Sequence, residues 1–328
     1  MEPSLSLKSI IKELRFGELT GLIILFAFLA ALYFAESVLL IKFLVSLLRK
    51  KPRKKPAKPI VILHALTLAS VLCLAYGFFI EPYWVETKII EIATPKLNKT
   101  SFRIAQISDL HCDRGSVNEK RIPDIINKLK PDIVVFTGDA LNTSLALPVF
   151  QDTLKRINAG IKYAVRGNVD ARYWPKINLF KNSGFKELNN KRAAVVKNGE
   201  TIFLYGMNYT YQKINPAMLQ NSAGKNFKIF LYHSSALIEY ARNNVDLYLS
   251  GHTHGGQVSL PFYGAIITLS KYGKKYESGI YHIGSTILYV NRGLGMDMMP
   301  APKIRFFARP EITIFDIKPV SDKQVSDK

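Results

Sequence analysis

Two long apolar segments lie near the start of the chain, and shorter apolar runs alternate with polar stretches after them. The long segments cover residues 19–48 and 59–80. A helix crosses the ~30 Å hydrocarbon core of a bilayer with roughly 20 residues, so each segment is long enough to span a membrane. Tyr83 and Trp84 follow the second segment, and such aromatic side chains favour the membrane surface. We therefore expect residues 1–84 to form a membrane-anchoring helical hairpin.

The chain beyond residue 84 has the pattern of an α/β domain. Short apolar runs typical of buried strands alternate with amphipathic segments, and the strands become more frequent toward the end. The expected strands are residues 103–108, 132–137, 161–166, 201–205, 228–232, 246–249, 287–291 and 311–317. The expected helices are residues 118–130, 147–158, 172–182 and 235–243. This order predicts one α/β domain over residues 85–318, followed by a disordered tail over residues 319–328.

A basic loop, residues 49–58, separates the two apolar segments and bears on the orientation of the hairpin. Loops rich in Lys and Arg stay in the cytoplasm, which would place the C-terminal domain on the outer side of a bacterial-type cytoplasmic membrane. Glu36 interrupts the first segment, however, so its second half could instead lie as an amphipathic piece on the cytoplasmic face. The face that carries the domain stays open between these two interpretations.

The charge of the chain narrows the class of partner. The formal net charge is +20, and residues 82–328 alone contain 34 Lys and Arg against 20 Asp and Glu. A field of this sign favours phosphorylated substrates, acidic lipid head groups or nucleic acid. We expect no nucleic-acid partner, because no motif of a nucleic-acid-binding fold is present. Nothing in the sequence indicates a protein partner, and the positions of Cys73 and Cys112 argue against a disulfide.

Polar side chains of three chemical types follow five of the expected strands. In open α/β sheets, ligands gather at the carboxyl ends of the strands, so these positions are expected to lie close together. The stretches are "SDLH", "GD", "GNVD", "YH" and "GHTH", and they contain Asp109, His111, Asp139, Asn168, Asp170, His233, His252 and His254. Two histidines one residue apart, framed by glycines that allow close approach, indicate a metal site.

This ordered set resembles the motifs of the calcineurin-like metallophosphoesterases. The resemblance covers about residues 102–317 and implies a four-layer α/β/β/α sandwich with two divalent cations at the sheet ends. By this likeness one cation would be held by Asp109, His111, Asp139 and His254, and the other by Asp139, Asn168, His233 and His252. Two cations ~3.5–4 Å apart can hold a phosphoryl group and an attacking oxygen. Mixed imidazole and carboxylate ligands suit Mn²⁺, our first expectation, or Fe or Zn.

One position departs from the family pattern. The family usually has a histidine between Asn168 and Asp170 that helps the leaving group depart, and this chain has Val169. General acid assistance contributes roughly 10²–10⁴-fold, so its loss suits a substrate with a good leaving group, such as a phosphoanhydride. The membrane-bound UDP-2,3-diacylglucosamine pyrophosphatases of lipid A synthesis resemble this chain in their apolar N-terminus, their core and their "RGLG…PAPKIRFFARPEI" ending.

Three hypotheses for function follow. The first is hydrolysis of a pyrophosphate or phosphodiester bond in a lipid-linked substrate at the membrane, with UDP-2,3-diacylglucosamine, cleaved to lipid X and UMP, as its most specific form. The second is a phosphoesterase that acts outside the cytoplasm on phospholipids or other phosphorylated compounds, and the third is a metal-free scaffold. Asp139, Asn168 and His233 are the expected catalytic residues. Candidate substrate contacts are Arg166, Asp170, Arg172 and Arg292, and residues 260–276 are expected to form a β-hairpin that contacts lipid or is merely exposed.

Overall fold

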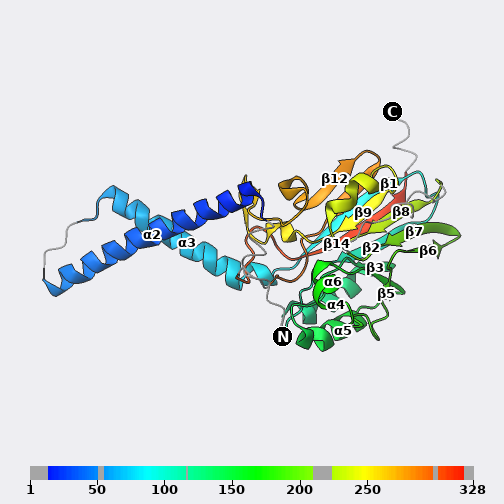
Figure 1. Cartoon of the computed structure of the whole chain (residues 1–328), viewed down its shortest axis with the longest axis horizontal. Coiled ribbons are helices and arrows are strands. Elements are labelled where there is room, and N and C mark those ends of the chain that lie inside the picture. Colours follow the sequence, from blue (N-terminus) through cyan, green and yellow to red (C-terminus); the bar gives the residue numbers. More distant parts are fainter. Residues whose placement is uncertain (1–13, 51–54, 116, 210–223, 298–301, 321–328) are drawn as a thin grey trace.

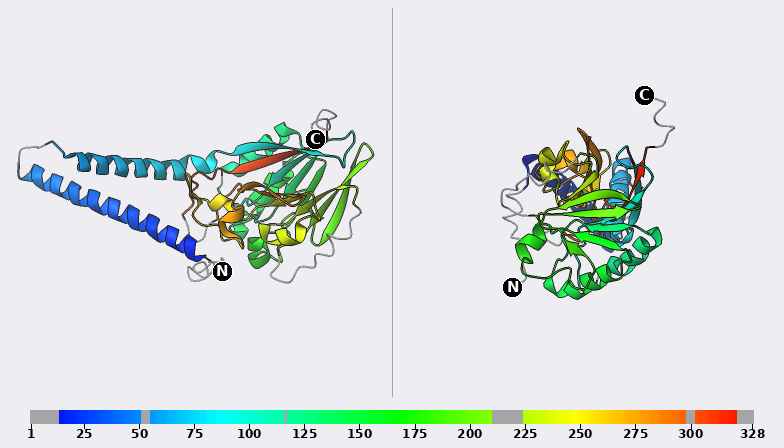
Figure 2. Two further views of the ribbon diagram at one scale, coloured as in Figure 1. Left: turned by 90° about the horizontal axis from the view of Figure 1, so that it is seen from above. Right: turned by 90° about the vertical axis from the view of Figure 1, so that its right-hand side faces the viewer.

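The computed structural model describes residues 14–50, 55–115, 117–209, 224–297 and 302–320. Helices α2 (Phe16–Leu48) and α3 (Lys58–Phe79) form a hairpin that projects from one end of the domain (Figures 1 and 2). Both helices are long and apolar enough to cross a membrane. Helix α2 continues through Glu36 without a break, so the structure does not contain a separate amphipathic piece after this residue. Most of the predicted tail, residues 321–328, lies outside the described residues.

Polar side chains join the two helices within their apolar stretches. Glu36 accepts a hydrogen bond from His64 at 2.7 Å and one from Thr67 at 3.3 Å, while the Tyr33 hydroxyl lies 2.9 Å from that of Ser70. Ionisable groups are costly in lipid unless they have partners. The charged residue that interrupts the first apolar segment therefore holds the hairpin together, with its partners on α3.

Two six-stranded sheets make up the body of the domain. The first has the order β1 (Glu86–Thr94), β14 (Glu311–Pro319), β2 (Phe102–Ile107), β3 (Ile133–Phe136), β4 (Ile161–Ala164), β5 (Lys186–Glu187). The second has the order β12 (Gly279–Ile283), β13 (Thr286–Val290), β9 (Leu247–Ser250), β8 (Phe227–Leu231), β7 (Glu200–Gly206), β6 (Lys191–Lys197). A short hairpin of β10 (Ser259–Leu260) and β11 (Gly264–Ala265) stands apart from both. The carboxyl ends of β2, β3 and β4 point the same way, as do those of β7, β8 and β9, because each trio is parallel.

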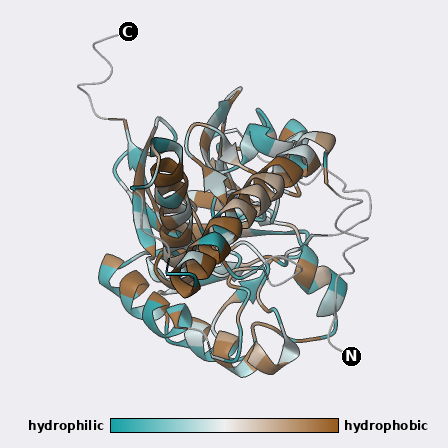
Figure 3. Cartoon of the chain, turned by 90° about the vertical axis from the view of Figure 1, so that its left-hand side faces the viewer, coloured by the Kyte–Doolittle hydropathy of each residue, from teal (hydrophilic) through white to brown (hydrophobic). Residues whose placement is uncertain are grey.

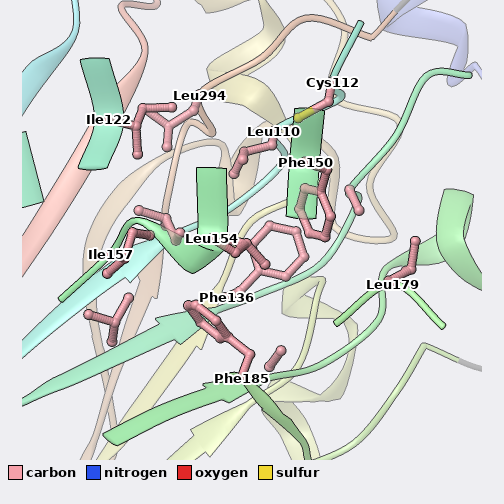
Figure 4. Close-up of a cluster of buried hydrophobic side chains, with 14 of the residues drawn as sticks. Leu110, Cys112, Ile122, Phe136, Phe150, Leu154, Ile157, Leu179, Phe185 and Leu294 are labelled. Carbon is pink, nitrogen blue, oxygen red and sulfur yellow. The ribbon is translucent and has the colours of Figure 1, made fainter. Parts of the chain in front are cut away.

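Helices cover the outer face of each sheet, which gives the four layers that the family resemblance implies. The two sheets pack on each other through fully buried side chains such as Ile104 and Leu231. Helices α4 (Asn118–Leu129) and α5 (Leu147–Lys155) cover the first sheet, where Phe136 contacts Phe150 at 5.4 Å between ring centroids (Figure 4). The outer face of the second sheet is covered by η3 (Ser235–Leu237) and α8 (Ile238–Ala241).

The structure corrects several element boundaries. All eight predicted strands are present, with ends that shift by up to two residues. The helix expected at residues 172–182 is wrong: α6 spans Asn168–Tyr173 and begins at the expected metal-ligating asparagine. Strands β1, β6 and β12 were not predicted, since their alternation leaves one face exposed. The hairpin expected over residues 260–276 is limited to β10 and β11, and a 3₁₀ turn, η5 (Gly273–Tyr276), follows it.

Glu119, in the first turn of α4, is a buried carboxyl with one oxygen that has no hydrogen-bond partner among the described residues. Burial raises the pKa of Glu119 from 4.5 to about 7, because water no longer stabilises its charge. The folded protein therefore holds this proton more tightly than the unfolded chain, and stability decreases as the pH rises from about 4.5 to 7. Glu119→Gln cannot ionise, so we expect it to increase the free energy of unfolding at pH 8 by about 3 kcal/mol.

The measurement is denaturant unfolding at pH 4 and pH 8. The gain from Glu119→Gln is expected at pH 8 and is expected to be absent at pH 4, where both states of the natural protein are protonated. The matched control is Glu239→Gln, because the Glu239 side chain is 49% exposed and makes only a surface ion pair. An effect of equal size at both pH values would contradict the assignment.

Candidate metal centre

Five loops bring the predicted ligands to one place between the two sheets. Asp109 and His111 follow β2, Asp139 follows β3, and Asn168 begins α6 after β4. From the second sheet, His233 follows β8, and the two histidines of the "GHTH" stretch follow β9. Because the carboxyl ends of these strands meet, residues up to 145 positions apart in the chain become neighbours, His254 and Asp109 among them.

Side-chain distances divide the cluster into two groups that share an edge. Asp109, His111 and His254 offer ligand atoms within 4.8 Å of one another, and so do Asp139, His233 and His252. The groups are joined by the Asp139 carboxylate: its Oδ2 lies 3.1 Å from Nε2 of His233 and 3.7 Å from Nε2 of His111. The structure thus places the shared carboxylate where the sequence expectation puts a bridging ligand.

The backbone of these loops is unusual. Five of the seven predicted ligands have the positive φ that L-residues rarely adopt: Asp109 (48°), His111 (41°), Asp139 (59°), His252 (78°) and His254 (53°). Strained conformations of this kind gather at functional sites, where the surrounding fold enforces them. Strand β9 ends at Ser250, so the two histidines of "GHTH" lie beyond it and strand alternation does not set their directions. Their backbone has positive φ at both positions.

Three of the four site histidines are held through one ring nitrogen, which leaves the other nitrogen directed into the cluster. Nδ1 of His233 donates to the carbonyl of Thr137 at 2.8 Å, Nδ1 of His111 lies 3.0 Å from the Asn142 amide oxygen, and Nε2 of His252 lies 3.1 Å from the carbonyl of Leu269. Such partners fix the orientation of metal-ligating imidazoles. This positioning set was not predicted, because nothing in the local spacing of Asn142 or Leu269 marks them.

Unpaired buried atoms test whether the site fits a cation. Within the described part of the chain, Nε2 of His111, Nε2 of His233 and Oδ1 of Asn168 are buried without a hydrogen-bond partner. Buried polar atoms without partners are rare in folded proteins. Nine such atoms occur among the described residues, and these three gather at the predicted ligand cluster, where they are imidazole and amide ligand atoms that divalent cations accept. The residues present therefore fit a pair of cations.

The charges of the cluster balance internally. Burial opposes ionisation of Asp139, but the charge of the nearby His233 outweighs this and lowers the pKa of Asp139 to about 2. The charges of Asp139 and Asp109 in turn outweigh burial of His233 and raise the pKa of His233 to about 10. Burial lowers the pKa of His252 to about 4, and it lowers that of His254 well below its ordinary value. Imidazoles bind cations in the neutral form, so these two rings are in the state that metal binding requires.

Three of the four candidate substrate contacts have other partners. Arg166 donates to Glu187 and to two backbone carbonyls, and Arg292 is held between two glutamates, Glu86 and Glu311. Both guanidinium groups are thus already paired with carboxylates, and a contact of either arginine with phosphate stays a prediction. Asp170 is fully buried and accepts hydrogen bonds from the backbone N–H groups of residues 139, 140 and 167, so it positions the loops and does not face substrate.

Arg172 is the remaining candidate. It lies one turn after Asn168 on α6, is exposed, and its guanidinium stands 5.3 Å from the ring centroid of Tyr173. We retain it as a proposed substrate contact.

Comparisons with known proteins identify the family. Residues 102–256 match the family model described as "Calcineurin-like phosphoesterase". The uncharacterized metallophosphoesterase YkuE of Bacillus subtilis (strain 168) is 36% identical over 266 residues, which cover 74% of this chain and 89% of that protein. The chain belongs to the calcineurin-like metallophosphoesterases. It is thus a hydrolase of phosphoric ester or anhydride bonds, and this family uses a centre of two metals.

Two further members of the calcineurin-like metallophosphoesterases have names that state an activity. Phosphodiesterase YaeI of Escherichia coli (strain K12) is 28% identical over 268 residues, 77% of this chain and 96% of that protein. UDP-2,3-diacylglucosamine pyrophosphatase LpxG of Chlamydia muridarum (strain MoPn / Nigg) is 28% identical over 324 residues, 77% of this chain and 95% of that protein. The family resemblance inferred from the motifs is confirmed.

Gly251 allows the backbone to approach the Asp109 carboxylate of the metallophosphoesterase site closely, and its replacement tests whether cation binding needs this approach. A Cβ at this position would stand 2.1 Å from Oδ2 of Asp109, which is far below van der Waals contact. We expect Gly251→Ala to push the Asp109 carboxylate out of its group and to weaken cation binding at least about tenfold, as loss of a positioning residue does. Isothermal titration of the metal-stripped protein with Mn²⁺ measures this affinity.

Gly160→Ala is the control, because a Cβ at Gly160 meets nothing within 4 Å. Equal Mn²⁺ affinities of the two variants would show that the close approach of Gly251 to Asp109 has no role in the site.

Proposed function

We propose that the protein is a membrane-anchored phosphohydrolase that cleaves a pyrophosphate or phosphodiester bond in a lipid-linked substrate. The leading candidate is UDP-2,3-diacylglucosamine, which would yield lipid X and UMP in lipid A biosynthesis. LpxG supports this candidate, since its name states this activity and it matches 77% of the chain. The two apolar helices support the lipid-linked class more generally, because they would keep the domain at a membrane.

The choice of a bond with a good leaving group rests on Val169, which stands where the family usually has a histidine. The residue sits at the start of α6 beside Asn168, and its backbone N–H donates to Oδ1 of Asp139 at 2.9 Å. Its side chain is 9% exposed and packs in the apolar cluster under the first sheet. The backbone of Val169 therefore contacts a predicted metal ligand. Its side chain, in the position of the usual histidine, cannot protonate a leaving group. A substrate with a good leaving group, such as an anhydride, tolerates this loss.

We assign the chain's residues to roles on this basis. Asp109, His111, Asp139 and His254 would hold one cation, and Asp139, Asn168, His233 and His252 the other. A bound pair of divalent cations, Mn²⁺ by our expectation and Fe or Zn otherwise, supplies Lewis-acid neutralisation of phosphoryl charge and activation of water. Asn168 and His233 orient the phosphoryl group between the two sheets, and Arg172 would meet its outer oxygens.

The test is incubation of the full chain in lipid nanodiscs with UDP-2,3-diacylglucosamine and Mn²⁺. We expect release of UMP at a rate well above that of an alkyl phosphomonoester such as glycerol phosphate. Turnover of the monoester with the nucleotide sugar left intact would contradict the proposal.

A second function, hydrolysis of phospholipid or other phosphorylated substrates outside the cytoplasm, is favoured by one observation. The basic residues at the hairpin turn, Arg49, Lys50, Lys55 and Lys58 among them, lie at the end of the helices remote from the domain (Figure 2). A cytoplasmic basic turn would put the domain on the other side of the membrane, away from nucleotide sugars. Protease digestion of sealed vesicles of known orientation decides: cleavage of the domain from the outer side alone favours this second function over the first.

A further inference from the structure

Both helices are attached to the domain through two loops, residues 258–277 and residues 302–309. On α2, Glu18 accepts hydrogen bonds from N and Oγ1 of Thr268, each at 2.8 Å. On α3, the carbonyl of Gly77 accepts from N of Arg305 at 3.0 Å, and Glu81, just beyond the helix, accepts from N of Phe307 at 2.9 Å. Both helices are therefore in direct contact with the domain. They fix how far these two loops lie from any bilayer that the helices cross.

The apolar lengths of the two helices determine the distance of the loops from the hydrocarbon core. Between Gly21 and Ile41, Glu36 is the only Asp, Glu, Lys or Arg of α2, and α3 has none of these residues between Lys58 and Glu81. Each interval has roughly the 20 residues that cross a ~30 Å hydrocarbon core. The Tyr263 hydroxyl lies 3.4 Å from the point where a Cβ would stand on Gly21, so the first loop meets α2 where the core ends. The second loop meets α3 at the matching level.

Large apolar side chains are exposed at this level. Phe262, at the tip of the β10–β11 hairpin, is 111% exposed, and Phe307, in the second loop, is 59% exposed. Trp84, which follows α3, is 50% exposed. Apolar side chains gathered on one surface mark a site of interaction with a membrane or a protein. Figure 3 shows the two helices, mostly brown and therefore hydrophobic, in front of the domain. A bilayer crossed by these helices would lie next to the exposed aromatic side chains.

Two positively charged side chains, Lys274 and Arg309, lie against aromatic rings of this surface. Nζ of Lys274 stands 3.3 Å from the ring centroid of Tyr263, and the guanidinium of Arg309 stands 3.8 Å from that of Trp84. Aromatic rings with basic groups beside them suit the layer where acyl chains meet head groups. Lys and Arg side chains near an anionic membrane surface are attracted to it, so the two pairs complement acidic lipid.

We propose that Phe262, Trp84, Lys274, Phe307 and Arg309 form a bilayer-docking surface that seats the catalytic domain on an anionic membrane. Phe262 and Phe307 enter the layer just below the head groups, and Lys274 and Arg309 meet lipid phosphates. The surface would be occupied by lipid and not by a protein partner, because it surrounds the points where both candidate spans leave the domain.

The same two loops hold histidines of the metal centre. Leu269, next to the residue that binds Glu18, contacts His252 through its carbonyl at 3.1 Å. Arg305, fully buried and bonded to the carbonyl of Gly77, has its Nη2 3.4 Å from Nδ1 of His254. The docking surface thus sets the site close to the membrane plane, where a substrate keeps its acyl chains in the bilayer while its phosphate enters the site. This selectivity rests on the proposed function; the docking itself does not.

Fluorescence quenching by brominated lipid tests the docking surface in the full chain. The probe is Phe262→Trp in a Trp84→Phe background, where Trp174, which is 7% exposed, gives a constant buried signal. The variant is placed in nanodiscs of phosphatidylcholine and phosphatidylglycerol, with and without bromine on the acyl chains. We expect roughly half of the added emission to be quenched, since docked apolar side chains lie about 5–10 Å into the boundary layer.

Val196→Trp in the same background is the matched control. Val196 is 64% exposed on β6, at the end of the domain opposite the helices (Figure 1), and we expect no quenching there. Equal emission of Phe262→Trp in both lipids would overturn the docking surface. Equal quenching with and without phosphatidylglycerol would overturn the proposed role of the Lys274 and Arg309 side chains.

A second readout separates docking from substrate choice. Phe262→Asp is expected to lower the ratio of hydrolysis of vesicle-resident substrate to hydrolysis of soluble bis(p-nitrophenyl) phosphate at least about tenfold, in line with the cost of a charge at the membrane boundary. Quenching without a change in this ratio would keep the docking surface and contradict the lipid-linked substrate of the proposed function.

Discussion

Asp139→Asn is expected to abolish binding of both cations and to lower phosphohydrolase activity at least about 10³-fold, because Lewis-acid stabilisation is worth several kcal/mol. The carboxylate reaches into both groups of the cluster, with Oδ2 3.1 Å from Nε2 of His233 and 3.7 Å from Nε2 of His111. Asparagine has nearly the same shape, but it is neutral and offers a single oxygen. Elemental analysis of the purified full chain, together with steady-state kinetics, measures both effects.

The control for this variant is Asp124→Asn. The Asp124 side chain is 70% exposed and makes one long surface contact with Arg156, so its replacement should leave metal content and activity at the level of the natural protein. If Asp139→Asn kept two cations per chain and near-natural activity, the carboxylate would not be the shared ligand.

Val169→His is expected to change which bond is cleaved. An imidazole at this position can protonate a poor leaving group, so hydrolysis of an alkyl phosphomonoester should increase by roughly 10²-fold, the lower limit of general acid assistance. Hydrolysis of a pyrophosphate should change little, because its leaving group needs no such help. The measurement is kcat/KM for both substrate types with the same preparation.

Val169→Ala separates the new imidazole from the loss of valine packing. Both variants remove the methyl groups that contact the apolar cluster under the first sheet, but only the histidine variant adds a proton donor. An equal effect of the two variants on the monoester would contradict the view that the valine determines leaving-group preference. A histidine variant with unchanged substrate preference would contradict it as well.

The sequence predicted the site better than it predicted the elements that hold it. Ligand positions were recoverable because each follows a short strand within four residues, and fully buried strands such as β3 and β8 are unbroken apolar or nearly apolar runs in the sequence. Strand β6 was missed, since it lies at the edge of its sheet and carries exposed Lys and Arg. Helix α6 was displaced because its first turn is set by contacts of Asp170 with residues around Asp139, thirty positions earlier.

Partners far apart in the chain explain the other differences. The sequence shows that Arg166 and Arg292 lie near strand ends, but not that Glu187 and Glu311, about twenty residues later, neutralise them. Arg305 belongs to no motif, yet it is buried beside His254 because three backbone carbonyls and a site histidine surround its guanidinium. Pairings of this kind depend on the register of distant loops, which hydrophobic periodicity does not encode.

Anomalous X-ray diffraction from crystals of the full chain grown with Mn²⁺ tests the central claim most directly. The account predicts two anomalous peaks between the sheets, one within reach of Asp109, His111 and His254, and the other beside Asn168, His233 and His252, with the Asp139 carboxylate between them. A map without a peak at this position, or with manganese bound elsewhere, would contradict the assignment and favour a metal-free scaffold.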